Sequence, residues 1–395
     1  MARPTAEVFD AIVLGAGGAG LMAAATAGQG GARVLVIDHA EKPGKKILIS
    51  GGGRCNFTNT GTRPACFLSE NPHFAKSALA RYSPADFLAL VARHRIAWHE
   101  KTLGQLFCDG SAREIVAMLL AECARGGVEI RLGTPIGEIG HADGWFSVAG
   151  ARARRLVVAT GGPSIPKMGA SGIAYDIARR FGLGVVAPRP ALVPLTLGED
   201  AADLRGLSGV ACPVVARVGD VSFAEAALFT HRGLSGPAIL QVSSYWRPGQ
   251  AIALRFLPDA AGMLRRARKA SPRAHLRATL AAHLPARLAE VLAARAGPLP
   301  ELGNLAERDI ARLDALIADF RLTPSGTEGY AKAEVTAGGV DTGDLESSTL
   351  GARRVPGLHV VGEAVDVTGW LGGYNFQWAW ASGVAAGRAI AAARG

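Results

Sequence analysis

The sequence has few cysteines, and they lie far apart. Cys55, Cys66, Cys108, Cys123 and Cys212 are the only five among 395 residues, and no two form a CxxC pair. An odd, scattered set argues against a secreted, disulfide-stabilised scaffold and indicates a reducing compartment. It also argues against a dithiol flavin reductase, which passes electrons through two closely placed thiols.

Long uncharged apolar runs are also absent. No such run reaches the roughly 18 residues that a membrane-spanning helix needs, although 49% of the residues are hydrophobic. The apolar stretch at 11–27 follows Glu7 and Asp10 instead of a basic cluster, and four glycines interrupt it, unlike a signal peptide. We therefore expect a cytoplasmic protein without a membrane segment, and nothing in the sequence predicts a metal site.

Lysine is scarce, although positive charge is not. Only 8 of the 43 basic residues are lysine, and the net charge is +10. An arginine bias together with abundant alanine also follows from genome composition, so basicity alone does not identify an anionic partner. The length allows two or three domains, and the 51 glycines, partly in clusters, indicate tight turns or backbone held close to a ligand.

The N-terminal segment has the pattern of a dinucleotide-binding unit. A short apolar strand is predicted at 9–14, a helix at 21–28 and a second strand at 32–38. Between the first strand and the helix lies the glycine-rich turn 15–20, GAGGAG. This order of strand, glycine turn, helix and strand predicts a pyrophosphate-binding turn.

Each glycine of this turn has a physical role in the prediction. Gly15 permits the tight turn, Gly17 lets the backbone approach the pyrophosphate, and Gly20 allows the helix to pack closely on the strand. The helix start offers unpaired N–H groups to the phosphates. Asp38 ends the second strand, where an acid accepts the ribose hydroxyls and disfavours an NADP 2′-phosphate, but it does not separate NAD from FAD.

The remaining pattern predicts a discontinuous α/β fold. Helical and strand patterns alternate to about residue 187, give way to proline-rich, strand-like segments and then to charged helices, and return after residue 332. We predict a dinucleotide-binding domain at 1–187 and 333–395, an inserted domain at 188–257 and 321–332, and a helical insert at 258–320.

Two further segments favour FAD over NAD. The loop 43–56 carries three successive glycines flanked by Ser50, Arg54 and Asn56, which suits an extended polyanionic ligand. Near the C-terminus, a strand ends in Gly362-Glu363, whose carboxylate suits the ribityl hydroxyls, and a glycine-rich turn leads into the last helix. There is no second G-x-G-x-x-G, so NAD(P)H is expected at most as a transient electron donor.

Several segments together resemble one known family. They are SGGGRCN at 50–56, ATGG at 159–162, FTHRGLSGP at 229–237, VTAGGV at 335–340 and GEAVDVTGWLGGYNFQ at 362–377. In order and over nearly the whole chain, they are similar to the BaiN/RdsA (YhiN-like) family of bacterial NAD(P)/FAD-dependent oxidoreductases. The resemblance implies a Rossmann-like FAD domain of the two-dinucleotide-binding type, completed by the C-terminus, with an inserted β-barrel-like domain and a small helical insert.

The same resemblance implies a set of residues that line the FAD. They are Gly15, Gly17, Gly20, Asp38, Lys45, Gly52, Arg54, Cys55, Ile136, Thr160, Gly161, Gly362, Glu363, Gly373, Asn375 and Phe376. Ile136 is expected to face the adenine through its backbone. Two positions depart from the family pattern: Asp38 stands where glutamate is more common, and Cys108 stands where proline is expected.

Two residues are candidates for proton transfer. His231 has a near-neutral intrinsic pKa, which suits a general acid, and Cys55 lies beside the predicted cofactor loop. For each residue a purely structural role remains open: His231 as a hydrogen-bonding residue at a domain interface, and Cys55 as a small buried residue that packs the loop.

The substrate is the least determined feature. The family resemblance implies reduction of a carbon–carbon double bond, in a ribosomal RNA uridine or in a small unsaturated metabolite. Residues 258–295 carry eight basic and two acidic residues, so Arg265, Arg266, Arg268 and Lys269 are predicted to contact RNA, unless they form only a solvated face. A non-enzymatic redox-sensing flavoprotein is a third hypothesis, and the sequence does not predict the oligomeric state.

Overall fold

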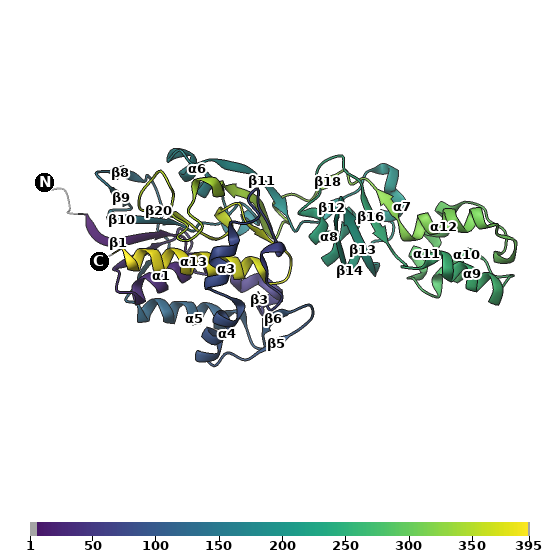
Figure 1. Ribbon diagram of the computed structural model, residues 1–395, viewed down its shortest axis with the longest axis horizontal. Helices are drawn as coiled ribbons and strands as arrows, with labels where there is room; N and C mark the ends of the chain where they lie inside the picture. The colour runs from purple at the N-terminus through teal and green to yellow at the C-terminus, as the bar shows by residue number, and fades with distance from the viewer. Residues whose placement is uncertain (1–5, 394–395) are drawn as a thin grey trace. The chain divides into compact units, whose positions relative to one another are not determined.

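The computed structural model describes residues 6–393 (Figure 1). It divides into two compact units, the first of residues 6–189 and 335–393 and the second of residues 190–334. The divisions lie two residues from the positions predicted from the sequence. None of the helices in the described chain has the length and hydrophobicity needed to span a bilayer.

The first unit contains most of the elements. They are β1 (Glu7–Leu14), α1 (Gly18–Gln29), β2 (Val34–Ile37), α2 (Lys45–Ile49), the 3-10 turn η1 (Ser50–Gly53), β3 (Asn56–Asn59), β4 (Phe67–Leu68), α3 (Ala75–Arg81), α4 (Pro84–Arg93), β5 (Trp98–Glu100), β6 (Gln105–Cys108), α5 (Ala112–Arg125), β7 (Glu129–Arg131), β8 (Gly140–Ala142), β9 (Trp145–Val148), β10 (Ala151–Val158), α6 (Ile173–Arg180), β11 (Val185–Ala191, which crosses the division), β19 (Val335–Val340), β20 (Leu358–Val360), β21 (Thr368–Gly369) and α13 (Tyr374–Ala392).

The main sheet of the first unit joins both ends of the chain. Its strands follow the order β7-β2-β1-β10-β9-β8, and β20 also pairs with β10. β7, β2, β1, β10 and β20 pair in parallel. β9 pairs antiparallel with β10, and β8 pairs antiparallel with β9. Four successive residues of β2, VLVI, are fully buried, as expected for a parallel strand covered on both faces. The predicted Rossmann-type α/β fold, completed from the C-terminus, is therefore present.

Helices α1 and α13 pack closely because both present small residues (Figure 1). A Cβ added at Gly383 would lie 2.6 Å from the Ala19 carbonyl oxygen, and one at Gly387 would lie 2.6 Å from that of Ala23. At Gly18 an added Cβ would meet the Trp380 ring at 2.7 Å. These contacts fix the start of α1 against the C-terminal helix, so both helices contribute to the same region of the unit.

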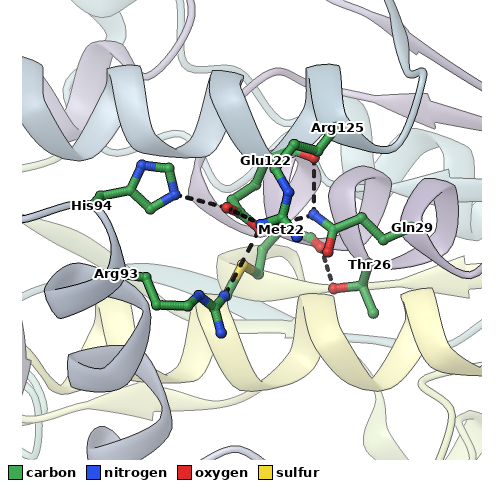
Figure 2. Close-up of polar contacts among 7 residues, drawn as sticks. All are labelled: Met22, Thr26, Gln29, Arg93, His94, Glu122 and Arg125. Atoms are coloured by element: carbon green, nitrogen blue, oxygen red, sulfur yellow. Dashed lines mark hydrogen bonds and ion pairs between the residues drawn. The ribbon is translucent and has the colours of Figure 1, made fainter.

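A buried carboxylate ties α1, α4 and α5 together (Figure 2). Glu122 accepts hydrogen bonds from Gln29 Nε2 at 2.8 Å, His94 Nε2 at 2.7 Å and Arg125 at 2.7 Å. Arg93 adds an ion pair at 3.9 Å. Burial by itself would raise the pKa of Glu122, but these hydrogen bonds outweigh it and hold the pKa below its usual value.

We expect Glu122→Gln to destabilise the protein by about 1–3 kcal/mol at neutral pH, because it removes a buried charge from three donors. The folded-state pKa of Glu122 is depressed, so its contribution is present above the unfolded-state pKa and is lost as the pH falls through the folded-state value. Urea unfolding of both proteins from pH 7 to pH 3 should therefore show the difference shrinking in acid. A difference that stays constant with pH would contradict this account.

The second unit combines one antiparallel sheet with a group of helices. Its elements are β12 (Leu195–Thr196), α7 (Ala202–Arg205), β13 (Ala211–Val218), β14 (Val221–Phe229), β15 (Gly233–Ser235), α8 (Pro237–Ser243), β16 (Ile252–Arg255), α9 (Ala260–Ala270), α10 (Leu276–Ala281), α11 (Ala286–Ala296), the 3-10 turn η5 (Leu302–Asn304), α12 (Glu307–Ala318), β17 (Phe320–Leu322) and β18 (Gly326–Thr327). The strand order is β17-β16-β13-β14-β15-β12-β18. Neither β14 nor α8 was predicted from the sequence.

Candidate cofactor site

The glycine turn after β1 leaves the start of α1 open. An added Cβ at Gly15, whose φ is +105°, would lie 2.6 Å from the Ala159 carbonyl oxygen, and one at Gly20 would lie 2.0 Å from that of Gly15. At Gly17, by contrast, no described atom lies within 4 Å of an added Cβ. No side chain caps α1, and no acid lies in its first turn. Its first N–H groups are therefore available to an anion.

Asp38 follows β2 and is bonded to the same glycine turn. Its Oδ2 accepts the Ala16 N–H at 2.6 Å, and its Oδ1 accepts the Ala40 N–H at 2.8 Å. The carboxylate thus holds the turn in shape, a role that the sequence did not predict. Each carboxylate oxygen keeps a further acceptor site, which suits the predicted ribose hydroxyls.

The loop at η1 adds a second exposed glycine segment. Gly51, Gly52 and Gly53 all have positive φ, and an added Cβ at Gly52 would meet nothing within 4 Å. Next to them, Arg54 is exposed and Cys55 is fully buried. Burial raises the pKa of the Cys55 thiol to about 12, against the opposing effect of a hydrogen bond with Ser50, so the thiol stays protonated at neutral pH.

A polar cluster surrounds Glu363, which follows β20. Its Oε2 pairs with Lys46 Nζ at 2.6 Å, and its Oε1 accepts hydrogen bonds from Ser164 Oγ at 2.8 Å and from the Thr336 N–H at 2.9 Å. The sequence predicted Glu363 as a residue that lines the FAD, but it did not predict these three partners. Lys46 was not among the predicted residues, and the predicted Lys45 donates from its Nζ to the Met168 carbonyl at 3.4 Å.

The C-terminal turn forms another uncapped helix start. α13 begins after Gly373, with no side-chain cap and no acid in its first turn. Asn375 closes the preceding turn, since its side chain accepts the Gly369 N–H at 2.8 Å and donates to the Gly369 carbonyl at 2.9 Å. Phe376 stacks on Trp380 at a centroid distance of 5.5 Å. The Asn375 side-chain amide therefore stabilises the turn before α13.

Two buried hydroxyls provide a test of whether this region fits FAD. Among the described residues, Thr160 Oγ1, Thr336 Oγ1 and Thr342 Oγ1 are buried without a hydrogen-bond partner. The first two bear on this site, because Thr160 directly precedes Gly161 and an added Cβ at Gly162 would be 2.7 Å from Thr336 Oγ1. Such groups are rarely left unpaired. Together with the open Gly17 and the two uncapped helix starts, they fit a long, polar, anionic ligand such as FAD.

The other predicted positions lie partly in this unit and partly in the second. Ile136 is buried, Gly161 has a φ of +71°, and Gly362 is buried with a φ of +67°. His231 is exposed in the turn between β14 and β15 of the second unit. All cofactor candidates therefore belong to the first unit, and one of the two proton-donor candidates does not.

Three of the four cations predicted to contact RNA are already engaged. Arg265 and Arg268 pair with Glu307 at 2.9 and 2.7 Å, and Arg266 pairs with Asp259 at 3.1 Å. The sequence showed the excess of charge but not these pairings. The two pairs with Glu307 depend on how α9 packs on α12.

Comparison with known proteins identifies the family. The model described as "HI0933-like protein Rossmann domain" matches residues 9–389. The chain belongs to this HI0933-like family. The resemblance drawn from its motifs, and the expected FAD-dependent oxidoreductase with a Rossmann-type domain, are thereby confirmed.

Three relatives match this HI0933-like protein over nearly their whole length. A protein of Escherichia coli (strain K12) named "Ribosomal RNA dihydrouridine synthase" is 52% identical, over 98% of this chain and 99% of its own. A protein of Haemophilus influenzae with the same name is 44% identical, over 97% and 99%. The "3-dehydro-bile acid delta(4,6)-reductase" of Clostridium scindens is 31% identical, over 96% and 98%.

Proposed function

We propose that the protein is an FAD-dependent reductase that converts uridine to dihydrouridine in ribosomal RNA, with NAD(P)H as electron donor. The observation that carries the proposal is the 52% identity, over 98% of the chain, to a relative named for that reaction. The relative named for a bile acid reaction is 31% identical and favours the same general chemistry on another substrate. An RNA substrate is also consistent with the cytoplasmic location expected from the sequence.

In this proposal each group described above binds a different part of the cofactor. The N–H groups at the start of α1, beside Gly17, hold the pyrophosphate, and Asp38 accepts the adenosine ribose hydroxyls. Glu363, held by Lys46, accepts the ribityl hydroxyls, and the start of α13 favours negative charge on the flavin ring. FAD, when bound, supplies hydride transfer at its N5 atom.

Reduction of a carbon–carbon double bond also requires a proton, for which the chain offers two candidates. The Cys55 thiol keeps its proton at neutral pH, but it is fully buried. His231 is exposed and belongs to the second unit. We therefore assign Cys55 to packing of the loop at η1, and His231 as proton donor stays a prediction from the sequence.

The proposal predicts a yellow protein and a missing nucleoside. The purified protein should show flavin absorbance, and mass spectrometry of ribosomal RNA nucleosides should show dihydrouridine lost from a deletion strain and restored by the wild-type gene. Unchanged dihydrouridine, together with NAD(P)H turnover on a small unsaturated acceptor, would instead support the metabolite reductase. Bound FAD that no unsaturated acceptor reoxidises would support a non-enzymatic flavoprotein.

A further inference from the structure

The helical insert is rich in arginine, but most of these arginines are held by the protein. Each of these engaged arginines has a carboxylate or carbonyl partner within the second unit. Arg265 and Arg268 pair with Glu307, Arg266 pairs with Asp259, Arg287 donates to the Gly206 and Ser208 carbonyls, and Arg295 pairs with Asp203. An RNA phosphate would have to compete with these partners. Three of the four cations predicted to contact RNA are thus already paired, whereas Lys269 is not.

Three basic residues of the insert lie close together in the chain and, like Arg308 and Arg312 of α12, differ from these engaged arginines. Lys269, Arg273 and Arg277 are exposed, and within residues 6–393 none has a hydrogen bond or ion pair with another side chain. We call these three residues the basic turn. Lys269 lies in the last turn of α9, Arg273 in the connection, and Arg277 in α10.

The backbone of the basic turn is fixed from both sides. The Ser271 N–H donates to the Ala267 carbonyl at 2.8 Å, which closes α9. From η5, the Gly303 N–H donates to the Pro272 carbonyl at 2.7 Å and the Leu302 N–H donates to the Ala274 carbonyl at 2.9 Å. The three side chains therefore extend from a held backbone instead of a loose loop.

We propose that the basic turn is the surface through which the protein docks on the sugar–phosphate backbone of ribosomal RNA, an inference that rests on the proposed function. Cations without carboxylate partners bind phosphate without first breaking an ion pair, and arginine offers two parallel N–H donors to a phosphate. Glu301, which precedes η5, is the acidic residue beside this turn and leaves the group with a net charge of +2. Such contacts position RNA without reading its sequence.

The test measures how binding depends on salt. Protein-free ribosomal RNA is titrated with the FAD-loaded full-length protein at several potassium chloride concentrations. Each phosphate contact adds about 0.7–0.9 to the slope of log Kobs against log salt. The double variant Arg273→Gln/Arg277→Gln should therefore have a slope shallower by about 1.4–1.8 and bind roughly tenfold more weakly at low salt.

A matched control removes the same charge elsewhere. Arg308 and Arg312 of α12 are also exposed and without a side-chain partner among the described residues. Arg308→Gln/Arg312→Gln should change the slope by less than about 0.5. An unchanged slope in the basic-turn variant, or an equal change in both variants, would overturn the proposal.

Complementation separates this proposal from the proposed function. Dihydrouridine is measured in ribosomal RNA from a deletion strain that carries each gene. If the wild type restores dihydrouridine but the basic-turn variant keeps the wild-type salt slope, the docking surface is wrong and the reaction stands. If the wild type restores none, the proposed function fails, whatever the slope.

Discussion

Gly17→Asp is expected to abolish FAD uptake while leaving the apoprotein as stable as the wild type or slightly more stable. Gly17 is the N-cap of α1, its φ of −83° suits any residue, and an added Cβ would meet no described atom within 4 Å. Aspartate is a favoured N-cap and should stabilise the helix by a few tenths of a kcal/mol relative to glycine. Its carboxylate would occupy the proposed phosphate position, where repulsion of about 3–4 kcal/mol lowers affinity on the order of several hundredfold.

The matched control for this prediction is Gly17→Asn, which keeps the shape and the capping group but carries no charge. It should lose much less affinity than the aspartate variant. FAD binding is followed by quenching of flavin fluorescence, and apoprotein stability by thermal unfolding. Wild-type FAD affinity in Gly17→Asp would show that the pyrophosphate does not lie at the start of α1.

The second large effect is expected at Gly373, where α13 begins. Its φ is +94°, and an added Cβ would lie 2.4 Å from the Thr58 carbonyl oxygen in β3. Alanine there combines backbone strain of about 1–2 kcal/mol with an overlap against backbone that cannot move aside. We expect Gly373→Ala to destabilise the first unit by more than about 3 kcal/mol and to weaken FAD binding, because the start of α13 is displaced.

The control Gly127→Ala introduces the backbone strain of a positive φ without a steric overlap. Gly127 also has a positive φ, of +63°, but no described atom lies within 4 Å of an added Cβ. Its replacement should cost about 1 kcal/mol. Urea unfolding followed by tryptophan fluorescence reports mainly on the first unit, because Trp98, Trp145, Trp370, Trp378 and Trp380 all belong to it. Equal losses in the two variants would mean that the contact with β3 is unimportant.

Local patterns predicted the parts of the fold that depend on neighbours in sequence. The strand predicted at 9–14, the run VLVI of β2 and the glycine turn before α1 each follow from residue type and spacing over a few positions. That a C-terminal strand and helix complete this domain was foreseen because a second glycine-rich segment suited the same ligand, but the pairing of β20 with β10 was not predicted.

Tertiary contacts decided what the sequence did not. Adjacent lysines differ by about 100° around a helix, so only the packing of α2 determines that Lys46 reaches Glu363 while Lys45 does not. The Ala16 N–H on Asp38 depends on two strands lying side by side. Likewise, an excess of arginine in the sequence does not show which arginines are already paired. Glu307, for example, pairs with both Arg265 and Arg268.

The pairing of β20 with β10 and the packing of α13 on α1 have a consequence for biosynthesis. The groups proposed to hold FAD come from the start of α1 and from the start of α13, more than 300 residues apart in the chain, so a nascent chain lacks the second part of this proposed surface until α13 has left the ribosome. We therefore expect a product truncated before α13 to accumulate as apoprotein, with the side of α1 that packs on α13 uncovered.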